Sequence, residues 1–185
     1  MVAQDITFAL PRGERYALIG PNGAGKTTLI NLITGLVRPD SGQILLGDGD
    51  ITGLRPEARV RQGLARTFQI NTLFPRLTAL ESVAIAILER GRSSTVWWKS
   101  LSDYRDAADE AHAILASLKL DGVALRPTRE LAYGQQRLLE IALALATKPR
   151  VLLLDEPAAG VPKDESAELF AALSGLSREL TVLFI

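Results

Sequence analysis

The sequence predicts an α/β fold with a mostly parallel sheet and a helical subdomain inserted into it. Short apolar runs at Arg15–Ile19 and Val151–Leu154 have the length and composition of buried strands. Each run is followed, after a loop, by a longer segment with the apolar spacing of a helix. Because strands that alternate with helices form parallel sheets, we expect these strands to share one sheet.

The domain organisation follows from the place where this alternation is interrupted. Residues 76–146 carry helical patterns, whereas strand-like runs occur before and after them. We therefore expect a single domain over residues 1–185, long enough for one sizeable core. In this domain 1–75 and 147–185 form the α/β core, and 76–146 form the helical subdomain.

The remaining elements of the core are predicted from the same patterns. We expect further strands at Gln43–Leu46, Leu64–Phe68 and Thr181–Ile185. Helical spacing predicts core helices at Lys26–Leu36 and Lys163–Leu180.

Three helices are predicted in the helical subdomain. The first begins at Thr78–Glu81, which matches a capping box, and continues with apolar residues along one face. The other two are expected at Asp103–Leu118 and Gln135–Thr147.

Composition excludes several classes of protein. A hydrophobic content of 47% excludes a disordered chain. The 21 basic and 21 acidic residues cancel, so net charge gives no support for binding to nucleic acid. Cysteine is absent, which excludes disulfides and thiolate metal sites and fits a reducing compartment. No apolar run approaches the roughly 20 residues that span a bilayer, and no signal peptide is expected, so any membrane role requires docking.

Residues Gly20–Thr27 match the phosphate-binding pattern G-x-x-x-x-G-K-[ST] in full, with a predicted strand before it and a predicted helix after it. Glycines let backbone N–H groups converge on phosphate oxygens, and the helix N-terminus adds partial positive charge. Lys26 supplies a full charge beside the β- and γ-phosphates, and Thr27 supplies a hydroxyl for Mg²⁺. The residues expected to contact the nucleotide are Gly20, Pro21, Asn22, Gly23, Ala24, Gly25, Lys26, Thr27 and Thr28.

Two adjacent carboxylates, Asp155 and Glu156, follow the predicted strand Val151–Leu154. Adjacent side chains at a strand end point in different directions, so the two can have different roles. Asp155 is expected to hold Mg²⁺ through its water shell, and Glu156 to position the attacking water in line with the γ-phosphate. The sequence therefore predicts a P-loop NTPase that binds ATP and Mg²⁺.

The segment Leu131–Gln135, read L-A-Y-G-Q, resembles the L-S-G-G-Q signature of ABC ATPases in its order and in its distance from the acidic pair. Thr67–Gln69 resembles the Q-loop of the same family. The resemblance implies a RecA-like core, an antiparallel β subdomain and a helical subdomain. It also implies that Gln69 contacts Mg²⁺ or the attacking water, as a metal ligand and catalytic residue beside Glu156 and Lys26. The signature residues that it assigns to the nucleotide are Ala132, Gly134 and Gln135.

The resemblance implies partners as well. ABC ATPases pair as homo- or heterodimers, in which the signature of one subunit contacts ATP bound to the other. They also bind transmembrane permease subunits. This chain is therefore expected in the cytoplasm, peripheral on the inner face of the membrane. Leu131–Arg137 and Asp155–Gly160 are most similar to the ATPases of branched-chain amino-acid importers. The expected function is ATP hydrolysis coupled to uptake of these or similar small solutes; Trp97–Trp98 either pack locally or contact the permease.

The sequence departs from the family pattern in several places. It begins at Met1, after the usual adenine-stacking residue, and ends at Ile185, before the usual switch histidine, so we expect slow ATP turnover. Gly160–Lys163 stands where the D-loop aspartate is usual, and Ala132 replaces a serine that contacts the γ-phosphate. His112 precedes the signature and is expected to have an ordinary surface role.

Three other functions are known for proteins with a phosphate-binding loop of this kind. A GTPase or kinase is disfavoured because Thr147–Arg150 ends in arginine where guanine recognition needs aspartate. ABC proteins of DNA repair or translation usually carry longer inserts or tandem cassettes, which this chain lacks. A truncated nucleotide-binding module with little or no hydrolytic activity remains the alternative to the importer ATPase.

Overall fold

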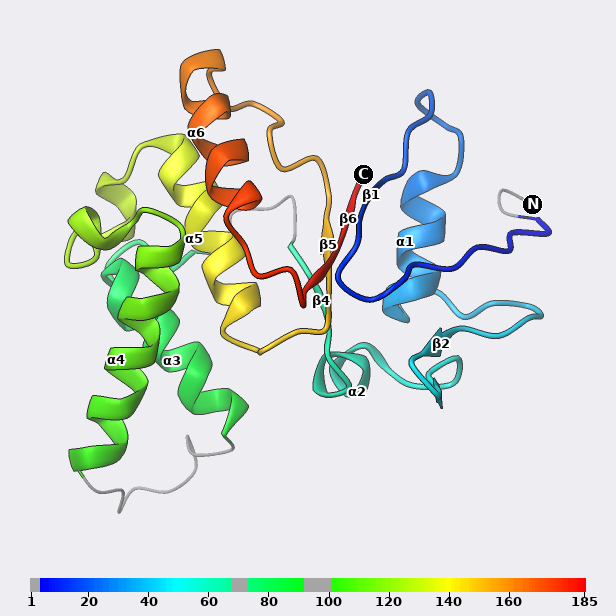
Figure 1. Cartoon of the computed structure of the whole chain (residues 1–185), viewed down its shortest axis with the longest axis horizontal. Helices are drawn as coiled ribbons and strands as arrows, with labels where there is room; N and C mark the ends of the chain where they lie inside the picture. Colours follow the sequence, from blue (N-terminus) through cyan, green and yellow to red (C-terminus); the bar gives the residue numbers. More distant parts are fainter. Residues whose placement is uncertain (1–3, 68–72, 92–100) are drawn as a thin grey trace. The chain divides into compact units, whose positions relative to one another are not determined.

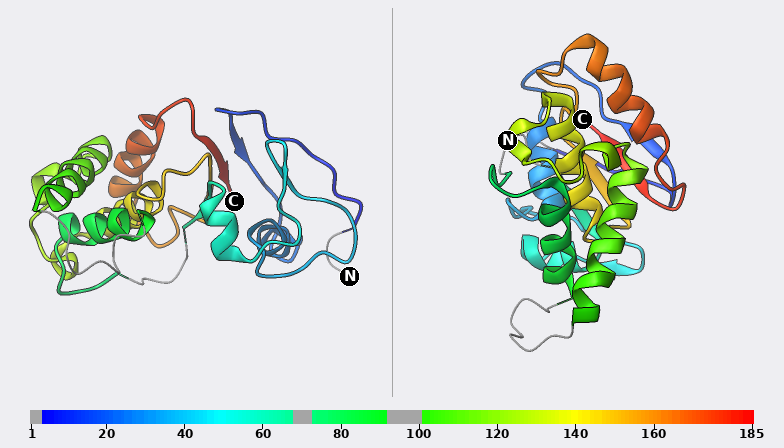
Figure 2. Two further views of the ribbon diagram at one scale, coloured as in Figure 1. Left: turned by 90° about the horizontal axis from the view of Figure 1, so that it is seen from below. Right: turned by 90° about the vertical axis from the view of Figure 1, so that its left-hand side faces the viewer.

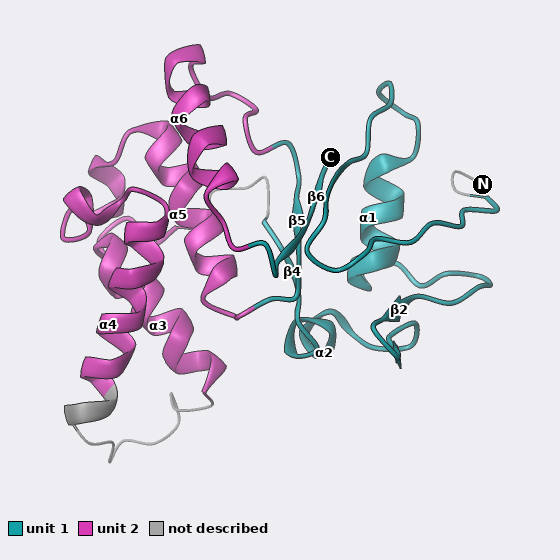
Figure 3. Ribbon diagram, in the orientation of Figure 1, with its two compact units in different colours: residues 1–67, 149–156, 178–185 teal, residues 68–148, 157–177 magenta. Residues whose placement is uncertain are grey.

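The structure is a computed structural model, and it describes residues 4–67, 73–91 and 101–185 (Figure 1). By compactness the chain divides into two units, coloured separately in Figure 3. Unit 1 consists of Met1–Thr67, Pro149–Glu156 and Arg178–Ile185. Unit 2 consists of Phe68–Lys148 and Pro157–Ser177.

This grouping differs from the expected division of the domain, because unit 2 begins at Phe68 rather than at 76 and also takes in a later segment. The segment Pro157–Ser177 belongs to unit 2, with the helices, although the sequence assigned 147–185 to the α/β core. Its helix carries the apolar residues Leu169, Ala172 and Leu173, which are buried within unit 2. Chain order alone does not reveal which neighbours a helix packs against.

A four-stranded parallel sheet forms the centre of unit 1 (Figure 1). The pairs β1–β6, β5–β6 and β4–β5 are all parallel. The two central strands consist of bulky apolar and β-branched residues, as expected for strands covered on both faces. In spatial order the strands are β1 (Arg15–Ala17), β6 (Thr181–Phe184), β5 (Val151–Leu154) and β4 (Leu64–Arg66).

The strand β1 lies at one edge of this sheet and is exposed along its whole length. The sequence predicted a buried strand at Arg15–Ile19, so the strand is present but its burial was wrongly predicted. An edge strand pairs on one side only, here with β6, and Ile19 beyond it is 89% exposed. An apolar run shows that a segment favours a strand, but not whether other elements cover it.

The helix α1 (Lys26–Thr34) packs against the sheet through the fully buried Ile30. It ends at Gly35, whose φ of 81° is in the left-handed region that glycine adopts without strain. The short strands β2 (Leu45–Leu46) and β3 (Gly49–Asp50) form an antiparallel pair, and α2 (Pro56–Arg61) lies against β4. The core residues around Ile30 are Ile51, Leu64, Leu153 and Leu183.

Arg59 ties the end of α1 to the loop before α2. Its side chain is 1% exposed. The guanidinium donates to the carbonyls of Leu32 and Ile33 at 2.7 Å each. It also donates to the carbonyls of Thr52 at 2.7 Å and Leu54 at 3.0 Å. Because the last carbonyls of a helix have no partner within the helix, Arg59 supplies the donors that α1 needs.

Unit 2 is helical. The helices α3 and α4 lie side by side (Figures 1 and 2), and α5 contacts both of them and α6. Its largest fully buried side chains come from α4, α5, α6 and the turn that follows α4. The helices are α3 (Ala79–Arg90), α4 (Leu101–Ser117), α5 (Tyr133–Leu145) and α6 (Lys163–Ser174), with 3₁₀ turns at Asp121–Val123 and Thr128–Glu130.

The predicted capping box at the start of α3 is present. Thr78 Oγ1 accepts from the Glu81 N–H at 3.1 Å, and Glu81 Oε2 accepts from the Thr78 N–H at 2.8 Å. The helix predicted at Lys163–Leu180 is shorter, because α6 ends before Gly175. None of the helices in the described residues is both long and apolar enough to cross a membrane. Trp97 and Trp98 lie outside the described residues.

We expect Arg59→Met to lower the free energy of unfolding by about 3 kcal/mol, because the partly buried carbonyls of Leu32, Ile33, Thr52 and Leu54 each lose the guanidinium as a donor. Arg61→Met on the same helix is the control, since Arg61 is exposed. Urea denaturation followed by circular dichroism measures both. Equal losses in the two variants would contradict this assignment.

Candidate nucleotide-binding site

Parallel pairing brings the phosphate loop and the acidic pair to the same edge of the sheet in unit 1. Ala17 of β1 and Leu154 of β5 both pair with Phe184 of β6, which lies between them. Neighbouring strands are about 4.8 Å apart, so the two segments leave the sheet about 10 Å from each other. The loop Gly20–Gly25 follows β1, and the acidic pair follows β5. This spacing suits a triphosphate lying across the end of β6.

The N-terminus of α1 is built to accept an anion. Gly25 is the N-cap residue, with a φ of 91°, and no side chain caps the helix. Gly23 is also left-handed, at 81°, and a Cβ at that position would meet no atom within 4 Å. The first N–H groups of a helix have no intrahelical acceptor and carry partial positive charge. Thr27 lies exposed in this first turn, where its hydroxyl is accessible.

Lys26 folds back over the loop that precedes it. Its Nζ donates to the carbonyl of Gly20 at 2.5 Å and to that of Pro21 at 3.0 Å. An ammonium group has three N–H donors, so these two bonds leave one for an anion held in the loop. The contacts fix the ammonium over the loop rather than in bulk solvent.

Asp155 is held by an arginine that no local sequence pattern marks as part of the site. Arg66 Nη2 donates to Asp155 Oδ2 at 2.5 Å, and the side chains are 10% and 11% exposed. Arg66 Nη1 donates to Asn31 Oδ1 of α1 at 2.9 Å. Asp155 therefore points into unit 1 and is tied, through Arg66, to the helix that follows the phosphate loop.

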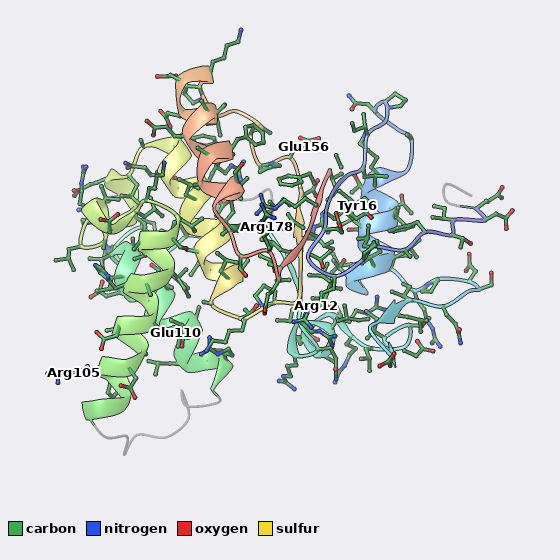
Figure 4. The ribbon with its side chains drawn as sticks, viewed as in Figure 1. Arg12, Tyr16, Arg105, Glu110, Glu156 and Arg178 are labelled. Carbon is green, nitrogen blue, oxygen red and sulfur yellow. The ribbon has the colours of Figure 1, made fainter. Side chains whose placement is uncertain are left out.

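Glu156 has a different environment from its neighbour. It is exposed, and Figure 4 shows it at the carboxyl end of β5. Its φ of 43° is left-handed, a conformation that costs a non-glycine residue about 1 kcal/mol. Its N–H donates to the carbonyl of Ile185 at 3.1 Å, which anchors the strained backbone to β6. The two acids thus differ in exposure, with Asp155 enclosed and Glu156 open to solvent.

These groups fit a magnesium nucleotide better than a metal held by protein alone. The described residues contain no cluster of three or more His, Cys, Asp or Glu that could hold a metal ion. A site with one carboxylate, Asp155, and one hydroxyl, Thr27, offers too few ligands for a protein cage. Mg²⁺ is commonly bound by one or two carboxylates together with substrate phosphates and waters. Gln69, the other expected metal ligand, lies outside the described residues.

The signature segment in unit 2 begins a helix, as expected. Ala132 is the N-cap residue of α5, and its N–H donates to Gln135 Oε1 at 3.1 Å. Gln136 Nε2 donates to the carbonyl of Leu131 at 3.0 Å. The Gln135 side chain, which was expected to contact the nucleotide, therefore caps its own helix.

Gly134 already has an anionic partner within unit 2. Its N–H donates to Glu165 Oε2 of α6 at 2.6 Å, and a Cβ on Gly134 would lie 2.6 Å from that oxygen. The amide that was expected to contact the nucleotide therefore donates to a carboxylate of its own chain in this structure. Glu165 was missed because only the packing of α5 against α6 brings it there.

Tyr133 and Arg137 fix the first turns of α5. Arg137 donates to the Tyr133 hydroxyl and to Glu140, both at 2.9 Å, and its guanidinium lies 5.2 Å from the tyrosine ring centroid. Burial raises the pKa of Glu140 although Arg137 pairs with it. The Tyr133 hydroxyl also donates to the carbonyl of Ala159 at 3.4 Å. These contacts hold the signature helix against the segment that follows the acidic pair.

Comparison with known proteins gives consistent matches. The chain matches the ABC transporter family over residues 3–159. It is 40% identical to the high-affinity branched-chain amino acid transport ATP-binding protein BraF of Pseudomonas aeruginosa, covering 100% of this chain and 75% of that protein. LivG of Escherichia coli K12, which carries the same description, is 39% identical with the same coverage. The ADP conformation of an ATP-binding cassette of an ABC transporter superposes with a TM-score of 0.79 at 32% identity, over 97% of this chain and 72% of that one. The expected P-loop NTPase fold is thereby confirmed.

We expect Glu165→Ala to lower the free energy of unfolding by about 1–2 kcal/mol, because the buried Gly134 N–H loses its acceptor. Asp164→Ala is the control, since Asp164 is exposed in the same first turn of α6. Thermal and urea denaturation of both variants measure the difference. A Glu165→Ala protein as stable as the control would show that this hydrogen bond contributes nothing.

Proposed function

This chain belongs to the ABC transporter family, as an ATP-binding subunit like those of branched-chain amino-acid importers, and on that premise we propose that it binds and hydrolyses ATP with Mg²⁺. We propose further that hydrolysis drives uptake of branched-chain amino acids or a similar small solute. The observation that carries the proposal is the uncapped N-terminus of α1, with Lys26 folded over its loop, on the sheet edge that also carries Asp155 and Glu156.

The phosphate loop binds and orients the triphosphate. Backbone N–H groups of Gly20–Gly25 and the first turn of α1, which includes Thr28, surround the β- and γ-phosphates. Lys26 donates its remaining N–H to the same oxygens. Thr27 and Asp155 hold the metal ion, with Gln69 as a further proposed ligand. Bound Mg²⁺ supplies a Lewis acid that offsets charge on the phosphate oxygens.

Glu156 activates the water in this proposal. Glu156 is exposed, whereas the Asp155 side chain is only 11% exposed, so Glu156 is accessible to a water in line with the γ-phosphate. A carboxylate oxygen of Glu156 accepts a proton as the water oxygen bonds to phosphorus. The bond from the γ-phosphorus to the bridging oxygen breaks, leaving ADP and phosphate. Lys26 and the loop amides stabilise the charge that builds up on the phosphate oxygens.

The partners follow from the family. We propose that a second ABC ATPase subunit, identical or different, contributes Ala132, Gly134 and Gln135 to the nucleotide bound by this chain, and the reverse. Glu165 must then leave the Gly134 N–H before a phosphate can take its place. Transmembrane permease subunits would hold the pair at the inner, cytoplasmic face of the membrane. The names of the relatives support the solute class.

Two variants test the site. We expect Lys26→Ala to weaken ATP binding at least about tenfold, because a charged hydrogen-bond donor to the phosphates is lost.

We expect Glu156→Gln to keep ATP affinity but lower turnover at least about 100-fold, because the general base is lost. Calorimetry measures binding, phosphate release measures turnover, and size-exclusion chromatography with ATP detects a trapped dimer.

Glu179→Gln is the control for the second variant, since Glu179 is an exposed glutamate of unit 1 with a side chain 83% exposed. It should bind and hydrolyse ATP like the wild type. If the wild type binds ATP without turnover and Glu156→Gln behaves identically, the nucleotide-binding module without hydrolysis is the correct reading. Unchanged ATP binding in Lys26→Ala would refute the site itself.

A further inference from the structure

We propose that Arg66 is a positioning residue for the magnesium nucleotide, acting through Asp155. The inference rests on the proposed function, because it takes Asp155 as the carboxylate that holds Mg²⁺. It adds a role for a residue that lies outside the phosphate loop, the acidic pair and the signature. The juxtaposition of Arg66, Asp155 and Asn31 within unit 1 carries it.

The backbone places Arg66 beside Asp155. Arg66 is the last residue of β4 and pairs in register with Leu153 of β5, two residues before Asp155. The next residue continues the pairing, because the Thr67 N–H donates to the carbonyl of Leu153 at 3.0 Å. Arg66 therefore starts from a fixed backbone, and its side chain reaches Asp155 along the sheet edge.

The guanidinium is held at two points by different nitrogens. Nη2 bonds to Asp155 Oδ2 at 2.5 Å, and Nη1 bonds to Asn31 Oδ1 at 2.9 Å. Asn31 lies on α1, the helix that starts at Lys26. Because a guanidinium is planar and its nitrogens are fixed relative to one another, these two bonds set the position of the Asp155 carboxylate relative to α1. Arg66 thus links the acidic strand end to the phosphate-loop helix.

Burial makes this link hard to replace. Arg66 and Asp155 are 10% and 11% exposed, so little water can substitute for either partner. Removing one partner of a buried pair leaves the other charge without compensation, which is costly and drives the side chain to move. A carboxylate that has turned outward cannot hold the metal where Thr27 and the loop place the phosphates.

The charge of Arg66 does not oppose the metal. A guanidinium would repel a bare cation, but Mg²⁺ arrives bound to a triphosphate, and the complex is an anion overall. Asp155 and Glu156 by themselves would repel that anion, whereas Lys26 and Arg66 balance them. Arg66 is therefore compatible with the loaded site and preorganises Asp155 before loading.

Arg66→Lys separates position from charge, because lysine keeps the positive charge but lacks the rigid fork that bonds two partners. The full chain is titrated with a non-hydrolysable ATP analogue by calorimetry, once with Mg²⁺ and once with EDTA. The ratio of the two affinities is the magnesium gain. We expect Arg66→Lys to lower the magnesium gain about tenfold, while affinity in EDTA stays within about twofold of wild type.

A double-mutant cycle tests whether Arg66 acts through Asp155. Asp155→Asn should abolish most of the magnesium gain, and adding Arg66→Lys to it should change nothing further. Asn31→Ala removes the second anchor and should give a smaller loss in the same direction; it also serves if Arg66→Lys fails to fold. Arg61→Lys, an exposed arginine of unit 1, is the matched control and should retain the full gain. Thermal unfolding of every variant checks that the fold is kept.

The outcomes are distinct. A full magnesium gain in Arg66→Lys or an equal loss of affinity with and without Mg²⁺ overturns the role of Arg66, as does an additive effect in the double variant. A wild type that binds no nucleotide, or binds it without any magnesium gain, overturns the proposed function instead. The inference is supported if Arg66→Lys loses the magnesium gain, Arg61→Lys keeps it, and the loss does not add to that of Asp155→Asn.

Discussion

Everything at the site depends on β6 pairing in parallel with β1 on one side and β5 on the other. Backbone hydrogen bonds continue this alignment past the strand ends, from Leu18 N–H to the Phe184 carbonyl at 2.8 Å and from Ile185 N–H to the Leu154 carbonyl at 2.9 Å. Because parallel strands present their carboxyl ends together, the phosphate loop and the acidic pair meet at one edge. If β6 paired in parallel with one neighbour and antiparallel with the other, the phosphate loop and the acidic pair would lie at opposite edges of the sheet.

Features that depend on consecutive residues could be predicted from the sequence. The P-loop pattern at Gly20–Thr27, the acidic pair after β5 and the capping box at Thr78 each involve residues close together in the chain. Their geometry is set by backbone conformation and helix ends, so residue types at fixed spacing are enough to indicate them. The order of strands and helices likewise indicated a parallel sheet, and the family match agrees.

Features that depend on distant residues could not be predicted in this way. Arg66 and Asp155 are 89 positions apart, and Gly134 and Glu165 are 31 apart. No local pattern marks such pairs, since arginine and glutamate are mostly found exposed to solvent at the protein surface. The exposure of β1 and the grouping of α6 with unit 2 were not predicted for the same reason. Both depend on which elements pack together. The sequence thus located the ligand-facing backbone but not the side chains that fix it.

The edge position of β1 has a practical consequence for work with the purified protein. Within the described residues β1 has a strand neighbour on one side only, and sheet edges readily pair with other chains. Self-association through such an edge needs neither nucleotide nor a signature motif, and it grows with protein concentration. An oligomer seen without nucleotide is therefore no evidence for the functional dimer, which is identified by the fraction that appears only with nucleotide.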